Sequence, residues 1–257
     1  MFGKTVLVGF GLILASGGWA ADEKADGSCE GAGPQSPRDI TIEKGSNSSR
    51  WAFAPEYKDM NLCNIHFHRF AEHKSPAFGR LGGEDENRGY ICENTRPKLK
   101  LSERSEDGKG CKGVIAGDTV EVHWVFSSCN VKPGATLNSC FNPKCKNPTL
   151  RVEARVFYLT DGKAGELDFA NYDVKGNQPK SLPKSKELVR YLGSTTGPKY
   201  TEESCSPFQV SWSVGAECSP LSMASLDRWC ENNVFKEDHA HGVRNIVRKE
   251  ELLSPIN

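Results

Sequence analysis

Alternating apolar and polar residues mark four segments of this chain as β-strands. These segments are residues 61–70, 119–126, 150–159 and 208–214. Successive side chains of a strand point to opposite faces, so alternation indicates a strand with one buried face. Their Val, Phe and Trp residues are typical of strands. A shorter alternating segment covers residues 40–43. The pattern therefore predicts a mainly β protein.

Helical patterns are few and lie outside these segments. Residues 184–191 fit a short helix, and residues 220–232 fit a longer one with Ser219 or Ser222 as its N-cap. Residues 75–118 are rich in Gly, Pro and charge and show no lasting period, which predicts a long excursion tied by cysteines. We expect a central twisted sheet with peripheral helices and long, disulfide-tied loops.

The first 20 residues have the pattern of a signal peptide. Lys4 precedes an apolar run over residues 5–15, and small residues lead to Ala20. The alternative, a membrane anchor, would need about 20 apolar residues, and this run is shorter. We expect cleavage near Ala20 or Ala21, no membrane span in the mature protein, and a periplasmic or secreted location. Residues 21–257 are enough for one well-cored domain.

Charge and cysteine content narrow the picture further. The chain has 33 basic and 33 acidic residues and no basic block, which gives no electrostatic reason to expect a nucleic-acid partner. Its ten cysteines, an even number behind an export signal, predict up to five disulfides. Zinc–thiolate binding is the alternative, but the sequence has no CxxC pair. Cysteine spacing leaves the pairing open.

Candidate metal ligands lie in the first predicted strand. The stretch NLCNIHFHRFAEHK, residues 61–74, holds three of the six histidines of the chain. On a strand, His66 and His68 point to the same face, so both imidazoles can converge on one ion. For this motif alone, two half-buried histidines without a metal are the alternative.

A third candidate, His123, lies in the second predicted strand, within EVHWV. Alternation places Glu121 and Val125 on the same face as His123. A metal-bound histidine usually donates its second N–H to a carboxylate or carbonyl, and Glu121 is near enough in sequence to accept it. Three histidines leave a tetrahedral ion one open position, which is the composition of a catalytic zinc site.

At this point the sequence resembles the carbonic anhydrases. HFH, the following Glu72-His73 pair and the later ExH resemble the α-class metal site. The sequences of residues 61–74 and of the tail HAHGVRN (residues 239–245) are most similar to the δ-class. QSPRDI, YLGSTTGP and VSW (residues 35–40, 191–198 and 210–212) resemble further α-class segments in the same order. The resemblance implies an α-carbonic-anhydrase-like central sheet and an enzyme that hydrates CO2 reversibly to bicarbonate by attack of metal-bound hydroxide.

The resemblance also assigns roles to individual residues. It implies that Zn2+ is held by His66, His68 and His123, with Glu121 behind the third ligand. Thr195 would orient the hydroxide, Glu72 would accept the proton of Thr195, and Thr196 would be its pocket neighbour. The walls of the CO2 pocket would be Val125, Val152, Val210 and Trp212. The proton-shuttle candidates are His73, His239 and His241. The resemblance further implies a Cys29–Cys205 disulfide.

Two departures and two rival functions remain. Only three residues separate His68 from Glu72, and Gly197 stands where the family has proline. One rival function is another exported zinc hydrolase, such as an esterase, and the chain has no HExxH motif. The other is a non-catalytic zinc-binding module, although all three ligands are present. CO2 and bicarbonate are the expected small-molecule partners, and an oligomer is left open.

Overall fold

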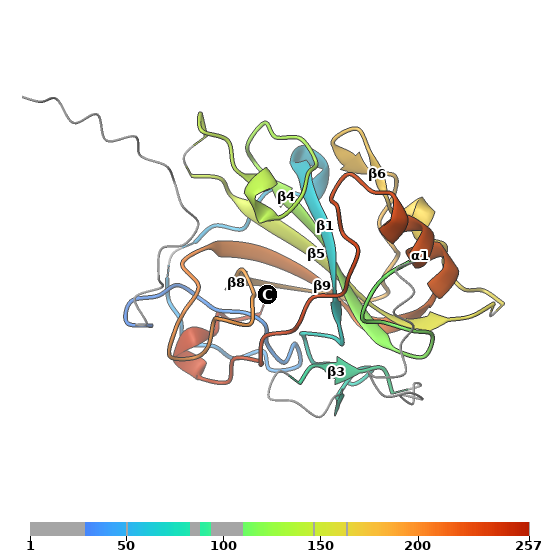
Figure 1. Cartoon of the computed structure of the whole chain (residues 1–257). Coiled ribbons are helices and arrows are strands. Elements are labelled where there is room, and N and C mark those ends of the chain that lie inside the picture. The colour runs from blue at the N-terminus through green and yellow to red at the C-terminus, as the bar shows by residue number, and fades with distance from the viewer. Residues whose placement is uncertain are drawn as a thin grey trace, which may run out of the picture.

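The computed structural model describes residues 29–49, 51–82, 88–93, 110–145, 147–162 and 164–256. The expected signal peptide lies outside these residues. A five-stranded sheet in the order β1-β4-β5-β9-β8 forms the centre of the protein (Figure 1). Its strands are β1 (Asn61–Arg69), β4 (Thr119–Ser127), β5 (Leu150–Thr160), β8 (Leu188–Ser194) and β9 (Gln209–Ser222). Neighbours are antiparallel except β5 and β9, which are parallel. The fold is mainly β, as predicted.

Smaller elements surround this sheet. Two short ribbons pair β2 with β3 and β6 with β7; their bounds are Arg80–Leu81, Tyr90–Ile91, Val174–Lys175 and Gln178–Pro179. The α-helix α1 covers Met223–Glu231, and the 3-10 turns are η1 (Tyr57–Asp59), η3 (Leu137–Cys140), η4 (Phe169–Asn171) and η5 (Glu250–Leu252). Within the described ranges, no helix has the length and apolarity to cross a bilayer.

The four predicted strands are present, and β9 is longer than expected. It continues to Ser222 because it pairs with β5 along nearly its whole length. The predicted short helix over residues 184–191 is wrong. Its second half belongs to strand β8, where Tyr191 is buried and stacks on Trp212 of β9, with ring centroids 6.2 Å apart. Packing against β9 overrides the local helical pattern there.

Two other predictions concern the short segment of residues 40–43 and the helix expected over residues 220–232. Residues 40–43 form no strand in the described structure; only the preceding Arg38 and Asp39 make isolated bridges. The predicted C-terminal helix is confirmed as α1. The Ser222 hydroxyl caps it by accepting a hydrogen bond from Ser225 N, which resolves the choice between Ser219 and Ser222.

Each face of the sheet buries its own apolar cluster. On one face Phe67, Trp124 and Phe157 pack with Phe169 of η4 and Trp229 of α1. The other face carries Val125, Val152, Tyr191 and Trp212. Each fully buried side chain of this size contributes about 1.5–3 kcal/mol relative to exposure. The candidate ligands His66, His68 and His123 lie on this second face, so a packed core on each side fixes the strands that carry them.

All ten cysteines are paired, as predicted. The pairs are Cys29–Cys205, Cys63–Cys140, Cys92–Cys218, Cys111–Cys230 and Cys129–Cys145. The first confirms the pairing that the family resemblance implied. Cys92–Cys218 and Cys111–Cys230 tie the long excursion between β1 and β4 to β9 and α1.

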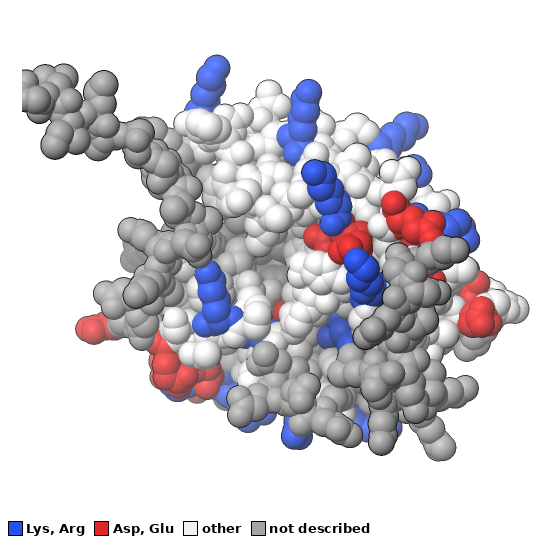
Figure 2. Space-filling model, viewed as in Figure 1, with Lys and Arg blue, Asp and Glu red and all other residues white. Residues whose placement is uncertain are grey.

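On the face seen in Figure 2, basic side chains stand singly, with acidic ones between them.

Candidate metal centre

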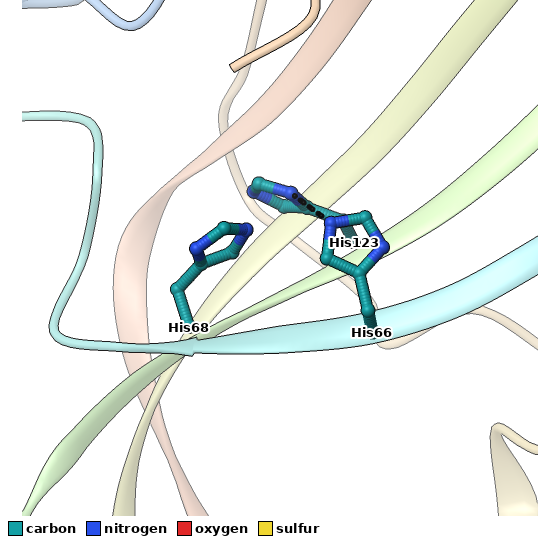
Figure 3. A group of neighbouring side chains, drawn as sticks. All are labelled: His66, His68 and His123. Atoms are coloured by element: carbon teal, nitrogen blue, oxygen red, sulfur yellow. Dashed lines mark hydrogen bonds between the residues drawn. The ribbon is translucent and has the colours of Figure 1, made fainter. Parts of the chain in front are cut away.

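The three candidate ligands converge from two neighbouring strands. His66 and His68 project from β1, and His123 projects from β4 directly opposite His66 in the register. One ring nitrogen from each lies within 4.8 Å of the other two. In Figure 3 the three rings turn toward a common point, and His66 Nε2 lies 3.2 Å from His123 Nδ1. The prediction that alternation brings these rings together is therefore met by the geometry.

The nitrogen that each ring turns away from this point has an oxygen partner. His66 Nδ1 lies 2.7 Å from Asn64 Oδ1, and His68 Nδ1 lies 2.8 Å from the carbonyl oxygen of Gly242. His123 Nε2 lies 2.8 Å from Glu121 Oε1. Each of these nitrogens donates its proton, so the remaining nitrogen of each ring presents a lone pair.

These residues fit a divalent metal ion. The inward nitrogens are His66 Nε2, His68 Nε2 and His123 Nδ1, and His68 Nε2 is buried without any hydrogen-bond partner. An unpaired buried polar atom costs about 1–3 kcal/mol. Burial lowers the pKa of His66 well below its usual value, and it also lowers the pKa of His68. Neutral imidazoles of this kind are the nitrogen ligands that zinc takes.

Two of the oxygen partners were not expected from the sequence. Asn64 reaches His66 because the register between them is regular, so the two side chains share a face of β1; the β-bulge lies before Asn64. Gly242 reaches His68 because the C-terminal tail runs beside β1, where His241 N donates to Phe67 O. A signal for Asn64 was available, since Asn64 precedes His66 by two residues as Glu121 precedes His123. The HAHGVRN tail resembles the δ-class, but its sequence gives no sign that the carbonyl of its glycine meets His68.

Glu121 is the most heavily bonded acid of the site. Besides His123, its carboxylate accepts hydrogen bonds from His73 Nδ1 at 2.7 Å, His73 N at 3.1 Å and Glu72 N at 2.8 Å. Burial would raise its pKa, but the charge of His73 and hydrogen bonds from His123 and His73 hold that pKa well below the usual value. An ionised Glu121 therefore fixes the ring of His123, as expected.

His73 is not placed to carry protons to solvent. Its side chain is fully buried, and its two ring nitrogens are bonded to Glu121 and to the Tyr191 hydroxyl, the latter at 2.7 Å. The other shuttle candidates lie nearer the surface. The His241 ring is 5.6 Å from that of His66, and the His239 ring is 5.0 Å from that of His241, centroid to centroid. The His239 side chain is 55% exposed.

Glu72 and Thr195 are not hydrogen-bonded to each other in the described structure. Strand β1 ends at Arg69, and Phe70, with a φ of 73°, turns the chain before Glu72. Glu72 Oε1 accepts from Arg244 N at 3.2 Å and lies 3.5 Å from His68 Nδ1. The Thr195 hydroxyl instead lies 2.6 Å from the hydroxyl of Ser206. Both predicted residues are therefore present, but with other partners.

The predicted pocket walls lie on the face of the sheet that carries the histidines. Val125, Val152 and Trp212 are successive register partners across β4, β5 and β9, and Val210 belongs to the same buried cluster. The Trp212 ring is 5.1 Å from the His123 ring, and Trp212 Nε1 donates to the carbonyl of Ser194. Thr195 follows Ser194, and Thr195 and Thr196 are both half-buried.

The fold and this site define a mainly β protein with a candidate three-histidine metal site beside buried apolar residues. Residues 57–225, more than half of the chain, match the family model of the delta carbonic anhydrases. The chain belongs to the delta carbonic anhydrase family. It is thus a carbonic anhydrase, and its general role is in CO2 hydration.

Solved structures of carbonic anhydrases also match. A hyperthermostable enzyme from a hydrothermal vent chimney is 15% identical, with 89% of this chain and 88% of that chain covered and a TM-score of 0.35. An enzyme from Dunaliella salina is 12% identical, with 87% and 86% covered and a TM-score of 0.42. The α-carbonic anhydrase of Photobacterium profundum is 16% identical, with 82% and 85% covered and a TM-score of 0.29. These scores are low, so the assignment rests on the family model. No curated protein matches the chain.

Proposed function

We propose that this chain is an exported zinc enzyme that converts CO2 and water to bicarbonate, with zinc held by His66, His68 and His123. The observation that carries the proposal is the convergence of three imidazole nitrogens, one of them buried and unpartnered. When bound, zinc would supply a Lewis acid that lowers the pKa of water at its open position to about 7, a value known from carbonic anhydrase itself.

The chain's own residues would prepare this site in two ways. Asn64, Gly242 and Glu121 accept the outward N–H of the three rings, so each ring is held in the tautomer that a metal needs. Neutral imidazoles leave the positive charge of the ion undiminished, whereas thiolates would oppose it. The buried carboxyl group of Glu72, with Oε1 3.5 Å from His68 Nδ1, would place a second oxygen beside the ring of that ligand.

The apolar wall would hold the substrate. CO2 is apolar and forms few polar contacts with side chains. Positioning it against the apolar wall would supply the effective concentration that the reaction needs. The residues of this wall are Val125, Val152, Val210 and Trp212. The hydroxyls of Thr195 and Thr196 would orient the polar reactant and the bicarbonate product. The proton released would leave by way of His241 and then the exposed His239, since His73 is enclosed.

The five disulfides support an export route, because disulfides persist in oxidising compartments such as the periplasm or the cell exterior. The predicted signal peptide would provide that route. Amino-terminal sequencing of the exported protein would test it, with a new terminus near Ala21 as the expected result.

The function itself is tested by metal content and CO2 hydration rate, measured on the same mature protein. We expect about one zinc per chain and hydratase activity, both lost in His123→Ala. The matched control is His239→Ala, which we expect to keep its zinc. Zinc retention without CO2 hydration would favour a non-catalytic module, and ester hydrolysis without CO2 hydration would favour another hydrolase. Full activity in His123→Ala would refute the proposed site.

A further inference from the structure

The Thr195 hydroxyl has a partner that family resemblance did not suggest. Its Oγ1 lies 2.6 Å from Ser206 Oγ, a distance typical of a good O–H···O hydrogen bond. We propose that Ser206 is a positioning residue that fixes the Thr195 hydroxyl, in place of Glu72. This inference rests on the proposed function, because it concerns how the Thr195 hydroxyl is oriented toward the reactants.

Burial decides which of the two hydroxyls donates. Ser206 is 1% exposed, and its Oγ already accepts from Phe208 N at 3.4 Å. A buried hydroxyl proton needs an acceptor, and Thr195 Oγ1 is the acceptor within reach among the described contacts. Ser206 therefore donates to Thr195. Thr195 is half-buried, so its own proton remains available to an oxygen of bicarbonate in the pocket.

Ser206 is itself held firmly by the amino-terminal segment. Gln35 Oε1 accepts from Ser206 N at 2.8 Å, and Gln35 Nε2 donates to Ser206 O at 3.0 Å. The neighbouring Cys205 is joined to Cys29. These contacts use the backbone of Ser206 and the next residue, so removing only the Ser206 hydroxyl leaves the loop anchored. Ser206→Ala can therefore change the orientation of Thr195 without releasing the loop.

Thr195 is connected to the metal centre through Trp212. Trp212 Nε1 donates to the carbonyl of Ser194 at 3.0 Å, and the indole ring packs 5.1 Å from the His123 ring. The Thr195 backbone is fixed as well, since its N–H donates to Phe208 O at 2.9 Å. With the backbone fixed on both sides, the remaining freedom of Thr195 is the rotation of its side chain, and Ser206 restrains that rotation.

The test is a double-mutant cycle read by bicarbonate binding at equilibrium. The probe is the visible absorption of cobalt(II)-substituted protein titrated with bicarbonate, which does not depend on turnover. Ser206→Ala should raise the bicarbonate dissociation constant roughly three- to tenfold, the effect of about one hydrogen bond. Ser206→Thr keeps a hydroxyl and should stay near wild type. In a Thr195→Ala background, Ser206→Ala should have no further effect.

The possible outcomes separate the two proposals. If Ser206→Ala weakens bicarbonate binding equally with and without Thr195, it acts through the fold and the inference is overturned. No effect in either background overturns it as well. A wild-type protein that binds bicarbonate but does not hydrate CO2 would contradict the proposed function. The double-mutant cycle could still be measured, because it depends on bicarbonate binding alone. Thermal unfolding of each variant checks that the loop stays folded.

Discussion

Replacing Asn64 with leucine should weaken zinc binding through the tautomer of His66. A neutral imidazole carries one proton, and metal binding through His66 Nε2 requires that proton on Nδ1. There it is accepted by Asn64 Oδ1 at 2.7 Å. In Asn64→Leu the free protein can move the proton to Nε2, but the metal-bound protein cannot. The cost of an unaccepted N–H therefore falls on the bound state and appears as lost affinity.

The size of this loss follows from the burial of the site. A buried donor without an acceptor costs about 1–3 kcal/mol. Residue His66 is half-buried, so water can reach it in part and the lower half of that range applies. A cost of about 1–2 kcal/mol corresponds to a zinc dissociation constant raised about 5- to 30-fold, at 1.4 kcal/mol for each factor of ten.

The assay is competition for zinc with a chromophoric chelator at pH 7. Asn64→Asp keeps an acceptor beside His66 and should bind zinc at least as tightly as wild type. Asn61→Ala is a control on the same strand, because the Asn61 amide donates to Cys129 O, away from the histidines. If Asn64→Leu binds zinc as tightly as Asn61→Ala, the tautomer of His66 is not set by Asn64 and the reasoning is wrong.

Two further predictions concern catalysis and stability. Thr195→Ala should keep its zinc but lose most of the hydration rate; an unchanged rate with zinc present would remove Thr195 from the mechanism. Burial would raise the pKa of Asp39, but hydrogen bonds from Lys74 and Thr41 outweigh it and lower that pKa. The ionised Asp39 carboxylate therefore stabilises the fold above about pH 4, and this stabilisation is lost as the pH falls through the folded pKa. Lys74→Met should therefore lower the unfolding free energy by less than about 1 kcal/mol at pH 7, and by progressively less as the pH falls through the folded pKa of Asp39, measured by urea unfolding. A difference that does not change with pH would argue against this ion pair as its source.

Alternation was sufficient to predict the strands that carry the candidate metal ligands. In β1 and β4 the side chains change face at every residue, so the pairs His66–His68 and Glu121–His123 each share a face without knowledge of the fold. The strand β8 was missed because its neighbours Lys184, Lys186 and Glu187 favour helix, while the interaction that decides its structure is with β9. That pairing is not visible locally, since the two strands are separated by a long disulfide-tied loop.

The partners of the ligands were harder to predict than the ligands. Asn64 shares a face with His66 by simple alternation, but whether its amide oxygen or another group accepts the His66 proton depends on the assembled fold. The Glu72 position depends on a turn at Phe70, where the backbone leaves the strand with a positive φ. The carbonyl of Gly242 carries no side-chain signal at all. Such contacts follow from the assembled fold, so family resemblance alone did not indicate that the Thr195 hydroxyl lies against that of Ser206.

The arrangement of these partners would link the proposed metal binding to the folding of distant segments. The three acceptors come from the bulged start of β1, from β4 and from the C-terminal tail, whose Gly242 lies 174 residues beyond His68. The tail is docked by hydrogen bonds from His241 N to Phe67 O and from Arg69 N to His241 O. With the tail in place, the carbonyl of Gly242 accepts the His68 Nδ1 proton at 2.8 Å, closer than the Glu72 carboxyl oxygen at 3.5 Å. Since a ligand that binds only the docked state stabilises that state by mass action, zinc should hold the tail against β1, and the docked tail should in turn tighten zinc binding.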